Sequence, residues 1–317
     1  GACAAQMCGA ATIRGFGHLQ FLALRRANSF ILFLLVIPLA FAVLVGLMWC
    51  FSLLRAKIIL RDDMMDETEL TWVEVAEECE NEVCALCLGF TLGVVVRVII
   101  TGSLPHMLLN GFEDFEHENH AGHAHHNESN VQAMSLLMGS GLVSAASSIF
   151  LIVINFGKFT SPVDKDTLRS SFRIRTLRLT IKSFTMCFAW CTCFSMDLVA
   201  SQICGDMEGV RFRLFIAIIQ SLCAFIMILG MDFISDMDCT GAAYDRAIVM
   251  LIEALGVSVG LSWEHAFHEC VEITVTYMSE DKVVFRATNN PKVWGFLVSV
   301  VIVITVLPAY RLYIVPT

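Results

Sequence analysis

The chain has 317 residues, of which 56% are hydrophobic and only 16% are charged, and its mean hydropathy is +0.70. Typical soluble domains are about 45–50% apolar and about 25% charged. A water-soluble globule of this size could not bury so many apolar side chains, which excludes most soluble enzymes, nucleic-acid-binding proteins and secreted disulfide scaffolds. The sequence therefore predicts an all-α, polytopic membrane helix bundle that forms a single membrane domain in a lipid bilayer.

Seven runs of the sequence are long and apolar enough to cross a bilayer, which takes about 20 residues. The first run, Phe30–Leu54, is too long for the core of a signal peptide, so we interpret it as a retained helix. Arg97 and Glu253 interrupt the second and sixth runs. The predicted spans are residues 30–54, 84–102, 131–156, 181–204, 214–234, 246–267 and 293–315.

The segment between the first two spans, residues 62–82, contains ten acidic residues and no Lys or Arg. Thr71 and Glu74 fit a capping box, the helix-start pattern in which two side chains bind backbone N–H groups. We expect a short amphipathic cytoplasmic helix that turns its acids to water and leads into the second span. A divalent-cation sensor is the alternative, although no EF-hand spacing is present. The apolar residues at helical spacing in this segment are Trp72, Val75, Ala76, Cys79 and Val83.

Small and charged residues share faces of the second and fourth spans. Gly89, Gly93 and Arg97 follow one another at four-residue steps, which predicts close packing of the two glycines against another helix. Asp197 lies within the fourth span at a depth similar to that expected for Arg97. A charge inside a span is costly without a partner, so we expect Arg97 and Asp197 to form an ion pair.

A histidine-rich loop, residues 113–130, separates the second and third spans, and we place it outside the cytoplasm. Imidazole and carboxylate groups bind zinc and similar ions, so the loop predicts loose, pH-sensitive capture of zinc or another divalent cation. A polar loop without a ligand is the alternative. The loop is similar to the histidine-rich loops of zinc-transporter families over about ten residues, but no predicted span carries HxxxD, HNxxD or HExxH. The candidate ligands are His117, His120, His123, His125 and His126, and Asn127 begins a glycosylation sequon.

The loop between the third and fourth spans sets the predicted orientation. Residues 158–182 contain seven basic and two acidic residues, which places this loop in the cytoplasm. Alternation of the spans then puts the N-terminus outside and the C-terminus in the cytoplasm of a plasma-membrane or endomembrane protein. Four basic residues in this loop are interpreted as an anchor to anionic lipid rather than as a voltage sensor: Arg173, Arg175, Arg178 and Lys182.

The sixth span separates apolar from polar residues around its helix for about 20 residues. One side carries Gly256 and Gly260, a GxxxG pattern that lets a neighbouring helix approach closely. Glu253, on the same side, is expected to face a polar passage. The full predicted polar pathway is Glu253, Glu264, His265, His268, Asp232, Asp197 and Arg97.

These patterns favour a cation-handling transporter or channel, with a divalent metal as one candidate substrate. A receptor-like or scaffolding subunit without a transport path is the main alternative. An intramembrane enzyme is a third, but the sequence contains no GxSxG, HExxH, Walker A or GxGxxG motif, so we expect no enzymatic activity. No cofactor beyond a divalent cation is predicted. We expect no nucleic-acid partner and keep homo-oligomers or membrane-protein complexes open.

Overall fold

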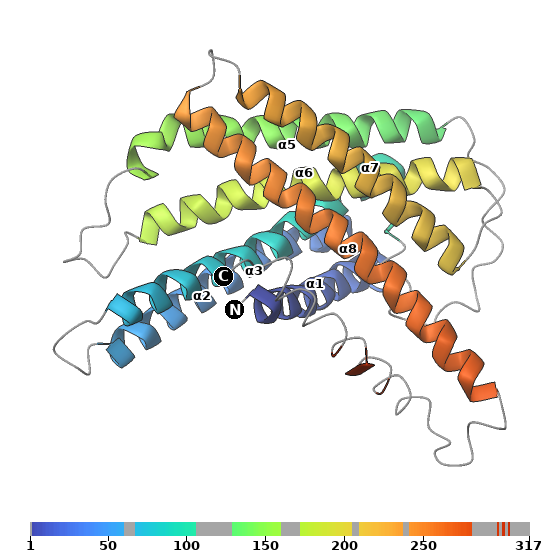
Figure 1. The fold of residues 1–317 in the computed structure, drawn as a ribbon, viewed down its shortest axis with the longest axis horizontal. Helices are drawn as coiled ribbons and strands as arrows, with labels where there is room; N and C mark the ends of the chain where they lie inside the picture. The colour runs from blue at the N-terminus through green and yellow to red at the C-terminus, as the bar shows by residue number, and fades with distance from the viewer. Residues whose placement is uncertain are drawn as a thin grey trace.

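The computed structural model describes residues 2–59, 67–105, 129–159, 172–204, 209–236 and 241–280, together with 297, 300, 301 and 304. Within these residues the protein is all-α and contains seven helices (Figure 1). They are α1 (Ala2–Arg25), α2 (Phe30–Ile59), α3 (Glu67–Thr101), α5 (Ser129–Phe159), α6 (Phe172–Cys204), α7 (Val210–Ser235) and α8 (Ala242–Glu280).

Six of these helices, α2, α3 and α5–α8, are long and apolar enough to cross a membrane. They contain the first six predicted spans, so the prediction of a polytopic helix bundle is confirmed and the protein is an integral membrane protein. The seventh predicted span, 293–315, lies outside the described residues except at Leu297, Val300, Val301 and Ile304. The predicted histidine-rich loop, 113–130, also lies outside them except for Ser129 and Asn130, which begin α5.

The helices α3 and α6 form the centre of the bundle. Most of the apolar stretch of each is buried, whereas α2 and α7 expose most of theirs. Many of the exposed side chains of α2, α5 and α7 are large and apolar, such as Leu35, Leu142 and Phe225. Such a surface suits lipid tails, and a continuous helix satisfies its own backbone hydrogen bonds there.

The contacts between helices fix their relative directions. Gly89 and Gly93 of α3 lie against Met186 and Trp190 of α6, in the same order, so the two helices run parallel. Ser144 of α5 donates a hydrogen bond to the Phe184 carbonyl of α6. Further along α6, Ser195 donates to the carbonyl of Met134, earlier in α5, so α5 and α6 are antiparallel. The C-terminal end of α3, which leads to the histidine-rich loop, and the beginning of α6 therefore lie at opposite ends of the bundle.

The acidic segment does not form a separate short helix. Glu67–Thr101 is one helix of 35 residues, so Thr71 lies inside a helix and the predicted capping box is wrong. The predicted apolar stripe is not the buried side either, because Trp72 and Val75 are exposed. The buried side of this part of α3 is polar instead.

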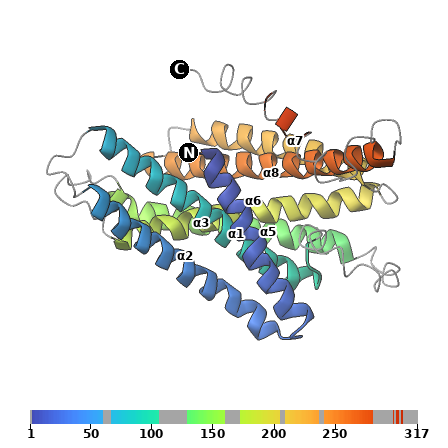
Figure 2. The same cartoon turned by 90° about the horizontal axis from the view of Figure 1, so that it is seen from below.

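The helix α1 was not predicted from the sequence. It crosses α3 obliquely, and Figure 2 shows α1 lying across the bundle. Gln20 is fully buried and donates a hydrogen bond to the Thr91 carbonyl of α3 at 3.1 Å. Gly9 lies close to Leu86 of the same helix. Besides Gln20, the residues that mark this contact are small or apolar and follow one another at helical spacing: Gly9, Ile13, Phe16 and Ala23.

The longest helix, α8, has 39 residues and is about 58 Å long at 1.5 Å per residue. This length is nearly twice the roughly 30 Å of a bilayer core. Figure 1 shows α8 running diagonally across the other helices. A tilted helix changes depth slowly along its sequence, so Glu253 need not lie at the membrane centre although apolar residues flank it.

Candidate functional site

The interface between α3 and α6 is closely packed along its middle. A Cβ atom added at Gly89 would collide with the Cβ of Met186 and lie 3.0 Å from the Cys187 backbone nitrogen. At Gly93 it would lie 3.0 Å from the Cβ of Trp190. Both glycines therefore lie where the sequence predicted helix packing. The tight contact leaves no space for a passage between these two helices.

An ion pair lies at one end of this interface. The Nη1 atom of Arg97 lies 3.1 Å from the Oδ2 atom of Asp197, which confirms the predicted pair. The Arg97 guanidinium carbon also lies 5.2 Å from the centre of the Phe194 ring, within the range of a cation–π contact. Arg97 is 5% exposed, and its Nε atom is buried without a hydrogen-bond partner. The pair lies in the membrane-spanning part of the protein, and its role in a polar pathway stays a prediction.

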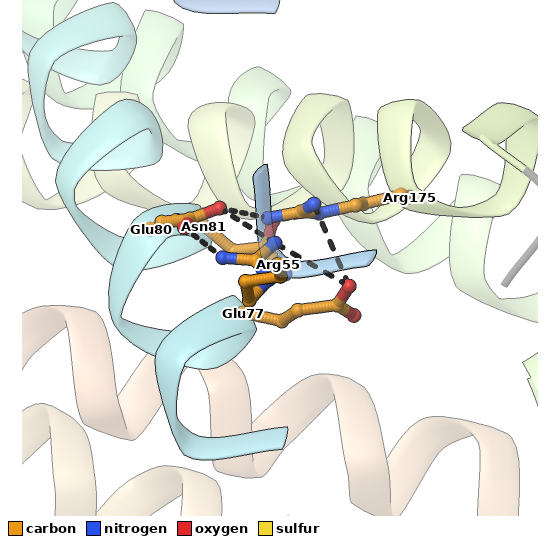
Figure 3. Close-up of polar contacts among 5 residues, drawn as sticks. All are labelled: Arg55, Glu77, Glu80, Asn81 and Arg175. Carbon is orange, nitrogen blue, oxygen red and sulfur yellow. Dashed lines mark hydrogen bonds and ion pairs between the residues drawn. The ribbon is translucent and has the colours of Figure 1, made fainter. Parts of the chain in front are cut away.

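A larger ionic network closes the other end of the α3–α6 interface (Figure 3). Arg55 of α2 and Arg175 of α6 share the carboxylates of Glu77 and Glu80 on α3. Each arginine lies 3.6 Å from Oε1 of Glu77, and both form hydrogen bonds with Glu80. The Nε atom of Arg175 donates to Oδ1 of Asn81 at 3.3 Å. Two positive and two negative charges thus join three helices.

This network corrects two expectations from the sequence. Glu77 and Glu80 are not solvated acids, because two buried arginines bind their carboxylates. Arg175 is not an exposed lipid anchor, since only 5% of its side chain is accessible. In both cases the charges find protein partners because α3 continues as a helix beyond the apolar run and meets the beginning of α6.

A second group of acids at this end is exposed. Glu78 and Glu82 of α3 and Glu253 of α8 are exposed, and none of them forms an ion pair within the described residues. Glu82 lies within electrostatic range of Glu78, Glu253 and Lys182. Glu253 thus lies within electrostatic range of a carboxylate that precedes the apolar run of α3. It does not line an enclosed passage in the described part of the protein.

The two glycines of α8 lie on the outward side of the helix. Gly256 and Gly260 are exposed, and a Cβ atom added at either would have no neighbour within 4 Å. Within the described residues no neighbouring helix packs against these glycines, so their predicted packing stays a prediction. The reason is orientation, because α8 turns Leu251, Leu255 and Ala266 toward the bundle instead.

The remaining predicted pathway residues separate into two groups. Glu264 and His268 are exposed and lie within electrostatic range of His265, as does Arg213 of α7. The Nδ1 atom of His265 lies 2.7 Å from the carbonyl of Leu261. Asp232 is exposed near the opposite end of α8, because α7 and α8 are antiparallel. The structure does not bring the predicted pathway residues together in one site.

Metal binding has no support from the described residues, among which no three His, Cys, Asp or Glu side chains could hold an ion together. The five predicted histidine ligands lie outside these residues, and so does Asn127. Metal binding by this loop and glycosylation at Asn127 therefore both stay predictions.

A polar contact between α7 and α8 was missed by sequence reasoning. Gln220 is fully buried and its Nε2 atom donates to the Ser258 hydroxyl at 3.2 Å. One turn further along α8, the Trp263 indole donates to Ser221 at 2.9 Å. These hydrogen bonds align the two helices within the membrane, where small polar side chains commonly join neighbours.

Comparison with known proteins adds no further assignment. No protein-family model, curated protein or solved structure matches the chain.

Proposed function

We propose that the protein handles cations in the membrane, as a transporter or channel without enzymatic activity. One observation carries the proposal: arginines pair with Glu77, Glu80 and Asp197 in the α3–α6 interface, yet nearby acids are exposed and form no ion pair within the described residues. Glu78, Glu82 and Glu253 form the exposed group, and we call it the acidic mouth. Carboxylates gathered at one end of a membrane protein raise the local concentration of cations.

A receptor-like or scaffolding subunit is the second candidate. The close contact of Gly89 and Gly93 with α6, and the two ionic clusters that close its ends, support this alternative. These features hold the central helices rigidly and need no substrate. The two candidates differ in what the acidic mouth does, and a flux measurement separates them.

Glu253→Gln is expected to reduce cation flux into proteoliposomes about tenfold, the lower end of the electrostatic enhancement that a charged mouth gives. The change removes one negative charge with almost no change in shape. Because Glu253 is exposed and unpaired, the thermal stability of the protein should stay near that of the wild type. Flux of zinc, manganese, sodium and potassium is measured with ion-sensitive dyes trapped in the vesicles.

The matched control is Glu74→Gln, which makes the same chemical change at an exposed glutamate of α3 outside the acidic mouth. This variant should transport like the wild type. If Glu253→Gln and Glu82→Gln both retain full flux, or if the wild type moves none of the four ions, the scaffold candidate replaces the proposal.

Metal capture by the histidine-rich loop is tested separately. A variant with His117, His120, His123, His125 and His126 all changed to alanine should lose zinc and nickel binding at about pH 7, because neutral imidazole is the ligand. Binding by the wild type should also fall at about pH 5, where histidine is protonated. Isothermal titration measures both effects, and circular dichroism checks that the helices persist. Equal zinc binding by variant and wild type would exclude the loop as a metal site.

A further inference from the structure

The helix α1 is not among the six candidate spans, yet it packs against the apolar run of α3. A Cβ atom added at Gly9 would lie 2.9 Å from Leu86, and the Gln20 side chain donates to the carbonyl of Thr91. Leu86 and Thr91 both lie between the ionic network of α3 and Arg97. The contacts of α1 are therefore at the level of the membrane-spanning part of α3, and not beyond it.

The order of these contacts gives the direction of α1. Gly9 meets Leu86 and Gln20 meets Thr91, so α1 advances toward the C-terminal end of α3. The helix α2 runs the other way, because Arg55, near its end, joins the network at the beginning of α3. Figure 2 shows α1 and α2 meeting at the end of the bundle away from the beginning of α3. The two helices thus form a hairpin, and the beginning of α1 lies toward the ionic network.

The side of α1 that turns away from α3 carries little charge. Arg14 is the only Lys, Arg, Asp or Glu between residues 2 and 24. Ala11, Gly15 and Leu19 follow one another at four-residue steps and are all exposed, Leu19 by 41%. Small and apolar side chains need no water, and the exposed side of the neighbouring helix α2 is apolar as well.

We propose that α1 is a further membrane helix, whose exposed side contacts lipid tails and whose beginning lies on the membrane side that holds the ionic network. A helix of 24 residues is about 36 Å long, so it can cross a bilayer core of about 30 Å at a moderate tilt. Its mean hydropathy is low because small residues replace leucine and valine where α1 meets α3. Small residues are typical of such contacts between membrane helices.

The polar side chains of α1 are compatible with this position. Gln20 is fully buried against α3, so it does not meet lipid. Arg14 lies between the contacts of Gly9 and Gln20, which places it about 6 Å along α3 from Cys84, where the apolar run begins. A long arginine side chain reaches the membrane surface from such a depth by snorkelling.

The proposal changes the side on which the chain enters the membrane. The sequence predicted no helix before residue 30, so it placed the chain ahead of that span on the side of the histidine-rich loop. With α1 inserted, the chain ahead of α1 lies instead on the side of residues 60–66, which join α2 to α3. The inference does not depend on the proposed cation handling, since a scaffold protein would have the same topology.

Epitope tags test the membrane side in the full-length protein. One tag is joined ahead of residue 1, a second is inserted between residues 62 and 63, and a third follows residue 122. The second and third tags mark opposite sides, because α3 crosses between them. Protease is added to sealed membrane vesicles of one orientation, and immunoblots follow the loss of each tag. The first tag should be cleaved or protected together with the second. Cleavage or protection together with the third tag would overturn the proposal.

A photoreactive phospholipid tests the lipid contact, with the full-length protein in nanodiscs. A diazirine in the acyl chain loses nitrogen on illumination, and the resulting carbene inserts into C–H bonds that it touches. Mass spectrometry should find Leu19 labelled to the same extent as Leu35 of α2, which is 52% exposed. The matched control is Val75, which is 47% exposed but precedes the ionic network on α3, and it should carry no label. Leu19 without label, like Val75, would mean that water or another protein covers α1, and the proposal would fail.

Discussion

Arg175→Ala is expected to destabilise the folded protein by about 3–5 kcal/mol, the cost of removing one partner from a buried ion pair. Arg175 is 5% exposed and contacts Glu77, Glu80 and Asn81 of α3. Without it, Arg55 alone would face two carboxylates, so a net negative charge would remain buried between three helices. Denaturant titration in detergent micelles, followed by tryptophan fluorescence, measures the loss.

Two further variants show whether the cost comes from the unbalanced charge. Arg211→Ala removes an exposed arginine of α7 and should change the free energy of unfolding by no more than about 0.5 kcal/mol. Arg175→Met combined with Glu80→Met removes one charge of each sign and leaves Arg55 with Glu77. Because a balanced apolar replacement is often neutral, the double variant should recover much of the stability lost in Arg175→Ala. A single variant as stable as the wild type would mean that the network contributes little to the fold.

Gly89→Ala should cost about 3 kcal/mol, the upper end of the range for overpacking a tight interior. The added methyl group would meet the Cβ of Met186 and backbone atoms of Met186 and Cys187. Backbone atoms cannot rotate away as the end of a side chain can, so α3 and α6 would have to separate. The same unfolding titration measures this loss.

Gly139→Ala is the matched control, because Gly139 lies inside α5 and an added Cβ atom would have no neighbour within 4 Å. Alanine is the better helix former by about 0.5–1 kcal/mol, so this variant should be slightly more stable than the wild type. If Gly89→Ala proves as mild as Gly139→Ala, α3 and α6 are not in tight contact at this level.

Parts of the central interface were predictable because they repeat at four-residue steps. The sequence placed Gly89, Gly93 and Arg97 on one face of a helix, and that face lies on α6. Continued toward the N-terminus, the same steps pass through Asn81 and Glu77, two members of the ionic network. These two residues lie outside the predicted second span, which begins at Cys84, because a span is defined by its apolar residues whereas a helix can continue well beyond the membrane.

Other features could not be predicted from local patterns. The glycines of α8 have the spacing of a packing motif, but spacing does not tell which side of a helix meets the bundle. That choice depends on Leu251, Leu255 and Ala266, whose burial turns Gly256 and Gly260 outward. The burial of Gln20 and Gln220 could not be predicted from the residues around them. Each side chain is buried because it donates a hydrogen bond to a group on another helix.

The sequence by itself determined that this is a membrane protein built of helices and placed six of its spans, because apolar runs of sufficient length have few other stable environments. It also determined that Arg97 and Asp197 need partners, because an isolated charge in a bilayer is costly. Only the tertiary structure decided which acids are buried between arginines and which are exposed. Glu77 and Glu80 are bound by Arg55 and Arg175, whereas Glu78 and Glu82, one or two residues away on the same helix, face outward. Successive helical residues point about 100° apart, so acids of equal charge differ in environment according to the helices that happen to pack beside them.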